Sequence, residues 1–176
     1  MLSLVCCVSI HAIKIDKDVV TSDGMRRVSA SAFNIYTEFS TAAAANVFAM
    51  EVNLDGEDHR DYFLTLFLNE GIFEIEKGSK LLLKLENDEV IELEAFEDVL
   101  KDAFMIRSGS VQPQYLIPME SLSKLTTGNV VKIRIETSNG IIDRKIKGNK
   151  FSKGVLESVT LINKAFQKKK DVYSDF

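Results

Sequence analysis

Two runs of alternating apolar and polar residues, joined at Asn139-Gly140, constrain the fold of this chain more than any other feature. The apolar positions within residues 130–146 are occupied by Ile133, Ile135, Ile142 and Ile146. Alternation with a period of two places successive side chains on opposite faces of a strand. An Asn-Gly pair supplies the positive φ that a tight hairpin turn requires. The segment therefore predicts a β-hairpin, which describes architecture and indicates no chemistry.

Short runs typical of β-strands, separated by turn residues, recur along most of the chain. We expect strands at Arg26–Tyr36, Asn46–Asn53, Asp61–Leu68, Ile72–Glu76, Lys80–Leu85, Val90–Phe96, Phe104–Ile106 and Tyr115–Ile117. Asp61–Leu68 is apolar on both faces, which predicts a central strand covered on each side. Ala42–Ala45 fits a helical turn or a loop, and Met119–Leu125 is expected to form short helical turns after Pro118.

The carboxyl-terminal part has a different period, which is typical of an amphipathic helix. Its apolar residues recur at spacings of three and four: Phe151, Val155, Val159, Ile162 and Phe166. We expect Ser152 to cap the helix amino terminus and Lys168–Lys170 to lie near its carboxyl terminus, where cations are favoured. Gly154 weakens the first turn and leaves the start of the helix open.

Many short strands followed by one helix predict a mainly β fold. We expect an antiparallel β-sandwich or partly open barrel with a C-terminal amphipathic helix packed on it. The 176 residues are 45% hydrophobic and 27% charged, as expected for one globular domain. The predicted division is a signal peptide remnant at 1–12, a single β-rich domain at 13–168 and a polar tail at 169–176. No apolar run reaches the roughly 20 residues of a membrane-spanning helix.

The first twelve residues are apolar, end at Ala12 and precede a charged stretch. This pattern predicts the end of a secretory signal peptide cleaved near Ala12. No Lys or Arg precedes the apolar run, so a buried first strand is the alternative. Cys6 and Cys7 both lie in this stretch, so a signal peptide would leave a mature chain without cysteine and without disulfides.

Charge is distributed unevenly along the chain. Residues 1–120 carry a net charge of −11 and residues 121–176 a net charge of +7. One interpretation is an anion-facing surface that includes Lys132, Arg134, Arg144, Lys145 and Lys147. The favoured alternative pairs these cations with Glu74, Glu76, Glu92 and Glu94 on neighbouring strands. No aromatic residue interleaves with the lysines, so nucleic acid is not an expected partner.

Candidate catalytic residues are few. His59 lies among four acids in residues 55–61. One hypothesis for this segment is a divalent-metal site, or His59 acting as a general base. The spacing of those acids matches no calcium-binding loop, so a solvated hairpin turn is the favoured interpretation. The sequence contains no Gly-x-Ser-x-Gly, no His-Glu-x-x-His and no phosphate-binding glycine loop. We expect no catalytic residues, no metal and no cofactor.

Several structural motifs resemble those of a family of uncharacterised secreted β-rich proteins from Bacteroidetes-type bacteria. They are Asp61–Leu66, Phe73–Leu85, Tyr115–Pro118 with Leu122 and Leu125, and Lys132–Gly140. The resemblance implies a β-rich fold and export, and it transfers no catalytic residue.

These observations together predict a non-enzymatic, exported binding or accessory domain, periplasmic or cell-surface associated. Its partner would be an unidentified protein or a cell-envelope component. One alternative is a small metal-dependent or acid/base hydrolase that uses His59 and nearby carboxylates. Another is association with a membrane or polyanion through the basic C-terminal third.

Overall fold

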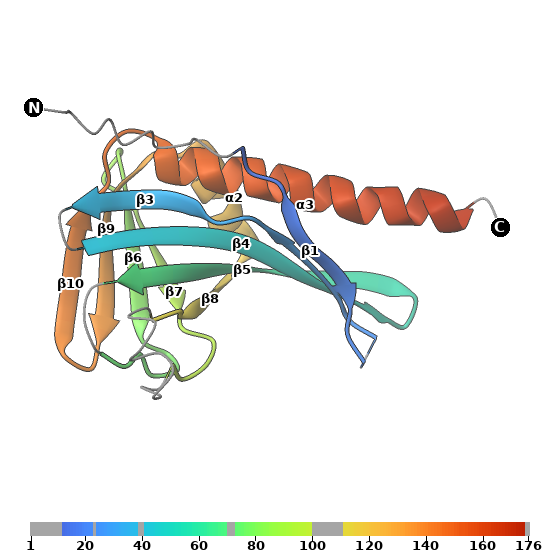
Figure 1. Ribbon diagram of the computed structural model, residues 1–176, viewed down its shortest axis with the longest axis horizontal. Helices are drawn as coiled ribbons and strands as arrows, with labels where there is room; N and C mark the ends of the chain where they lie inside the picture. The colour runs from blue at the N-terminus through green and yellow to red at the C-terminus, as the bar shows by residue number, and fades with distance from the viewer. Residues whose placement is uncertain (1–11, 23, 39–40, 70–72, 100–110, 175–176) are drawn as a thin grey trace, which may run out of the picture.

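In the part of the chain that the structure describes, two antiparallel β-sheets and two helices share one hydrophobic core. The computed structural model describes residues 12–22, 24–38, 41–69, 73–99 and 111–174. Figure 1 shows the strands of the second sheet running across one end of the first, with the long C-terminal helix beside the first sheet. The predicted mainly β fold, an antiparallel sandwich that does not close into a barrel and carries a C-terminal helix, is confirmed.

The first sheet, sheet A, has the strand order β1-β2-β4-β5-β8, and β3 also pairs with β4. Its strands are β1 (Ile15–Val20), β2 (Arg26–Ala30), β3 (Phe33–Glu38), β4 (Thr41–Leu54), β5 (Glu57–Asn69) and β8 (Gln114–Ile117). The long β4 and β5 pair along their whole length. β5 lies between β4 and β8, and Tyr62, Phe63, Leu64, Thr65 and Leu66 are all buried. The prediction of a covered central strand at Asp61–Leu68 is therefore confirmed.

Sheet C, the second sheet, has the order β10-β9-β6-β7. Its strands are β6 (Lys80–Leu85), β7 (Val90–Glu94), β9 (Val130–Thr137) and β10 (Gly140–Lys145). One face of this sheet enters the core through fully buried side chains, which include Leu81, Leu83, Ile133 and Ile135. The residues between them along each strand point to the opposite, outer face.

The hairpin predicted for residues 130–146 forms between β9 and β10, but its turn differs from the predicted one. Ser138 and Asn139 occupy the turn, and the positive φ belongs to Gly140 (105°), which pairs with Thr137. Asn139 is not among the residues with positive φ. The Thr137 hydroxyl accepts a hydrogen bond from the Asn139 N–H at 3.2 Å and donates one to the Gly140 carbonyl at 2.8 Å. Side-chain bonds at the turn therefore help to close the hairpin.

Helix α2 (Met119–Thr127) follows Pro118, as predicted, and helix α3 spans Lys150–Ser174. The predicted apolar stripe of α3 is confirmed, because Phe151, Val155, Val159, Ile162 and Phe166 are all buried. Ser152 is not the N-cap. It lies inside the first turn, where its buried hydroxyl accepts a hydrogen bond from the Val130 N–H at 3.1 Å.

Other local predictions change with the tertiary structure. Ala42–Ala45 is neither helix nor loop, because cross-strand pairing with β3 and β5 recruits it into β4. Arg26–Tyr36 is divided into two strands, β2 and β3, that pair with different parts of β4. The predicted tail at 169–176 is helical as far as Ser174, so Lys168–Lys170 lie inside α3 rather than at its end. The predicted strand at 104–106 and residues 1–11 of the predicted signal peptide lie outside the described residues.

No helix within the described residues is long and apolar enough to cross a membrane.

Candidate anion-binding surface

The outer face of sheet C brings together basic side chains from strands that are far apart in sequence. Lys84 on β6 lies directly opposite Lys132 on β9, and Lys132 lies opposite Lys145 on β10. Directly opposed side chains on neighbouring strands are about 5 Å apart at Cβ, and like charges at such positions repel. The three strands therefore carry a continuous row of three lysines, the lysine row.

Arg134 lies on the same face as the lysine row, one pair further along β9, opposite Leu82 and Asp143. Its Nε and Nη2 donate to the two oxygens of Asp143 at 2.7 and 2.8 Å. The Lys132 ammonium donates to the same carboxylate at 2.9 Å. These hydrogen bonds hold the pKa of Asp143 well below its usual range and raise the pKa of Arg134. One carboxylate thus serves two cations.

A shallow hollow of about 150 Å³ lies at the junction of β6, β7 and β9. It is lined by Leu82, Lys84, Val90, Lys132 and Arg134. Lys84 pairs at 2.6 Å with Asp88, four residues further along the chain, and that aspartate is almost fully exposed. Among the described residues Lys145 forms no ion pair. The lysine row and Arg134 therefore supply four cations against two neighbouring carboxylates.

The other end of the same face is acidic. Lys80 on β6 contacts Glu92 at 2.8 Å and Glu94 at 2.5 Å on β7. Two of the four glutamates expected to neutralise the basic strand residues, Glu92 and Glu94, thus bind Lys80, while Lys132 and Arg134 bind Asp143 of their own hairpin. The face consequently carries a basic end and an acidic end.

The structure separates the five residues of the predicted anion-facing surface. Lys132, Arg134 and Lys145 share the outer face of sheet C, whereas Arg144 is paired with the buried Ile133 and belongs to the opposite face. Lys147 is exposed just beyond the end of β10. Consecutive residues of one strand point to opposite faces, so Arg144 and Lys145 do not lie on one surface as predicted.

Lys84 is the residue that the sequence interpretation missed. Its alternation with Leu83 and Leu85 does place it on a solvent-facing position. What brings it to Lys132 is the pairing of β6 with β9, and these strands are separated by β7, β8 and α2 in the chain. No local pattern contains that pairing.

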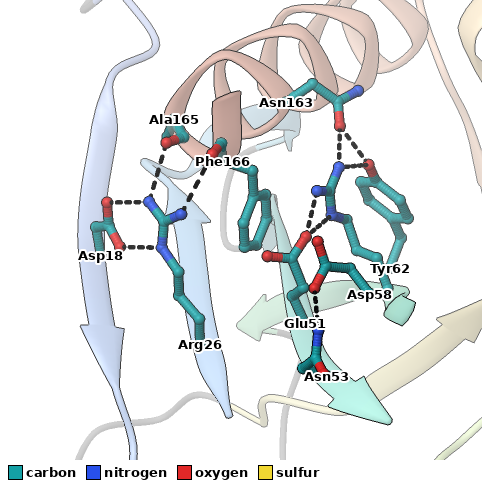
Figure 2. Close-up of polar contacts among 10 residues, drawn as sticks. Asp18, Arg26, Glu51, Asn53, Asp58, Tyr62, Asn163, Ala165 and Phe166 are labelled. Atoms are coloured by element: carbon teal, nitrogen blue, oxygen red, sulfur yellow. Dashed lines mark hydrogen bonds and ion pairs between the residues drawn. The ribbon is translucent and has the colours of Figure 1, made fainter. Parts of the chain in front are cut away.

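A second polar cluster anchors α3 to sheet A (Figure 2). The guanidinium groups of Arg26 and Arg60 lie over the Phe166 ring, with their central carbons 4.7 and 4.0 Å from its centroid. Arg26 also binds Asp18 and the Ala165 carbonyl, and Arg60 binds Glu51 and Asn163. Because every one of these groups is engaged within the chain, the cluster is best explained as structural.

His59 is exposed on β5, opposite Val52, close to the β4–β5 turn. The carboxylate of its neighbour Asp58 accepts a hydrogen bond from Asn53 at 2.8 Å (Figure 2). In the part of the chain that the structure describes, no three His, Cys, Asp or Glu side chains gather closely enough to hold a metal ion. The exposed position of His59 beside the β4–β5 turn agrees with the solvated hairpin turn that the sequence favours.

No protein-family model, curated protein or solved structure matches this chain. The resemblance to secreted Bacteroidetes-type proteins accordingly stays a prediction.

Proposed function

We propose that this protein is a non-enzymatic binding module that holds an anionic polymer, such as an acidic polysaccharide of the cell envelope, against the basic end of sheet C. The lysine row carries the proposal. Three lysines placed directly opposite one another cost stability in isolation, and a bound polyanion converts that repulsion into attraction.

The spacing of the cations favours a polymer over a single small anion. Neighbouring strands are about 4.8 Å apart, so Lys84, Lys132 and Lys145 span about 10 Å across three strands. One phosphate or carboxylate carries only about one to two negative charges and so balances only part of such a row. A chain with repeated negative groups can contact each lysine in turn, and the apolar Leu82 and Val90 offer contact area to its less polar parts.

Export is the second part of the proposal. It rests on the apolar stretch 1–12 and on the resemblance to secreted proteins, and an envelope polysaccharide is available only to an exported protein. Expression in a bacterial host followed by fractionation and amino-terminal sequencing tests this part alone. A cytoplasmic chain that retains residues 1–12 would contradict export and leave the binding surface to be judged separately.

Heparin is a suitable probe for the binding surface, because it is a linear polyanion that can be titrated by calorimetry at several salt concentrations. We expect affinity to fall steeply between about 50 and 300 mM NaCl, since exposed charges are screened over about 10 Å at 0.1 M salt. Lys145→Ala removes the lysine that forms no ion pair among the described residues, so it should weaken binding by about two- to fivefold, as expected for an exposed pair worth up to about 1 kcal/mol.

Asp143→Asn tests whether the carboxylate shared by Lys132 and Arg134 limits binding at this surface. It frees Lys132 and Arg134 from their shared carboxylate and should strengthen heparin binding, whereas loss of a merely structural ion pair would weaken or not change it. Lys80→Ala is the matched control on the same sheet face, because its ammonium is held between Glu92 and Glu94. Equal effects of the Lys145 and Lys80 substitutions, or weaker binding by Asp143→Asn, would refute the proposal.

A further inference from the structure

A groove of about 430 Å³ runs between the edge strand β1 and the flank of α3. It is lined by Ile15, Asp18, Arg26, Leu161, Lys164, Ala165 and Lys168. Its volume falls within the roughly 300–1,000 Å³ of sites for small ligands. The groove lies on the other sheet from the lysine row and is independent of it.

The walls of the groove are apolar along most of their length. Ile15 comes from β1, and Leu161 and Ala165 come from one flank of α3, next to the buried Ile162 and Phe166. All three wall residues are only partly buried. Apolar surface is therefore left available between the strand and the helix.

The rim on the helix side is basic. Lys164 and Lys168 are exposed and lie one helical turn apart. No ion pair to either lysine is found among the described residues. The acid on the strand side is already engaged, because Arg26 Nε and Nη2 donate to the two Asp18 oxygens at 2.9 and 2.8 Å. The groove thus combines an apolar wall with two available cations at one side.

The length of the groove limits its occupant. From Ile15 to Asp18 the strand rises about 10 Å, and from Leu161 to Lys168 the helix rises about 10 Å. An extended alkyl chain of about eight carbons covers this distance at C–C bond lengths near about 1.5 Å. A groove of these dimensions suits one chain rather than the paired chains of a phospholipid.

We propose that this groove binds a single-chain fatty acid of medium length, with its tail between Ile15, Leu161 and Ala165 and its carboxylate at Lys164 and Lys168. The two lysines favour a ligand with a carboxylate head group, and the apolar walls favour a ligand with an alkyl tail. No chemistry is performed on the ligand, because the groove only shields the tail and pairs the head group.

The experiment titrates laurate, kept below the concentration at which it forms micelles, against the full chain and follows displacement of dansyl undecanoic acid by fluorescence. We expect saturable binding of one laurate per chain. Lys164→Gln with Lys168→Gln should weaken it about tenfold, as expected for the loss of two exposed charge pairs. Octanoate already spans the groove and should bind about as tightly as laurate, whereas butanoate, with four fewer methylenes than octanoate, should bind at least about tenfold more weakly. Dodecanol should also bind more weakly than laurate because it lacks the charge.

Two control variants and one variant of the groove wall make the test decisive. Lys153→Gln changes an exposed lysine of the same helix outside the groove and should leave the affinity unchanged. Lys145→Ala should also leave it unchanged, which separates this groove from the lysine row. Leu161→Ser should weaken binding by loss of wall contact.

Other results would overturn the proposal. Equal affinity of the double glutamine variant and Lys153→Gln would exclude the head-group site. Absence of saturable displacement would exclude the groove as a fatty-acid site altogether. Binding to anionic phospholipid vesicles that laurate does not compete for would assign the two lysines to a lipid surface instead. None of these outcomes bears on heparin binding, so the two proposals fail separately.

Discussion

Gly154 provides a quantitative test of how α3 packs on sheet A. A glycine inside a helix normally costs about 1 kcal/mol relative to alanine, so propensity alone predicts that Gly154→Ala stabilises the protein. The structure predicts the reverse. A Cβ at this position would lie 2.5 Å from Cε2 and 2.6 Å from Cγ of Phe33, far inside van der Waals contact.

The Phe33 ring cannot easily move away. It packs edge-on against Phe151, with ring centroids 6.2 Å apart and planes at 79°, and Phe151 is fully buried. Overpacking of this kind costs about 1–3 kcal/mol, which exceeds the helix-propensity gain. The difference between the two effects predicts that Gly154→Ala destabilises the fold by up to about 2 kcal/mol.

A double-mutant cycle measured by urea unfolding and far-UV circular dichroism isolates this contact. In a Phe33→Ala background the methyl group added at position 154 has space, so Gly154→Ala should become stabilising by up to about 1 kcal/mol. Lys153→Ala is the neighbouring control, because its side chain is exposed. If Gly154→Ala stabilised the wild-type chain, or had the same effect with and without Phe33, the packing argument would be wrong.

Three further predictions concern stability. Phe166→Ala should cost about 3–5 kcal/mol in urea unfolding, because it empties a buried site between two guanidinium groups, while the exposed control Leu156→Ala should stay within about 0.5 kcal/mol. Gly140→Ala should cost about 1 kcal/mol through backbone strain at φ 105° alone, since no heavy atom lies within 4 Å of the added Cβ, and unchanged stability would contradict this. The pKa of Asp143 is lowered in the folded chain, so this carboxylate stabilises the fold fully above its unfolded pKa of about 3.9 and loses that contribution as the pH falls through the folded value. When the pH is lowered from about 4, the urea midpoint should therefore decrease less for Asp143→Asn than for the wild type.

The parts of the fold that the sequence predicts are those set by local period and burial. The alternation through residues 130–146 is dictated by one buried face, and Ile133 and Ile135 lie on it. The stripe of α3 is dictated in the same way, since each of its apolar residues meets sheet A or the core. Such patterns can be predicted from sequence because the buried face of a single strand or helix determines where its apolar residues lie.

The parts that the sequence does not predict depend on partners distant in the chain. Ala42–Ala45 has weak strand propensity and becomes a strand because β3 and β5 supply hydrogen bonds on both sides. Ser152 looks like an N-cap until Val130 is known to lie beside it. The lysine row also cannot be predicted from sequence, because it forms only when β6, β9 and β10 pair in this register.

That register also bears on why the row exists. A one-residue slip of β9 against β6 would move Ile133 and Ile135 out of the core, so the buried face fixes which outer residues are opposed. Given that constraint, acids or neutral side chains at positions 84 and 145 would remove the repulsion around Lys132 at no cost to the core. Sheet C does use opposite charges at its other end, where Lys80 lies between two glutamates. A local conflict that the same sheet avoids elsewhere is expected at a functional surface, and this expectation supports the proposal that the lysine row binds an anionic ligand.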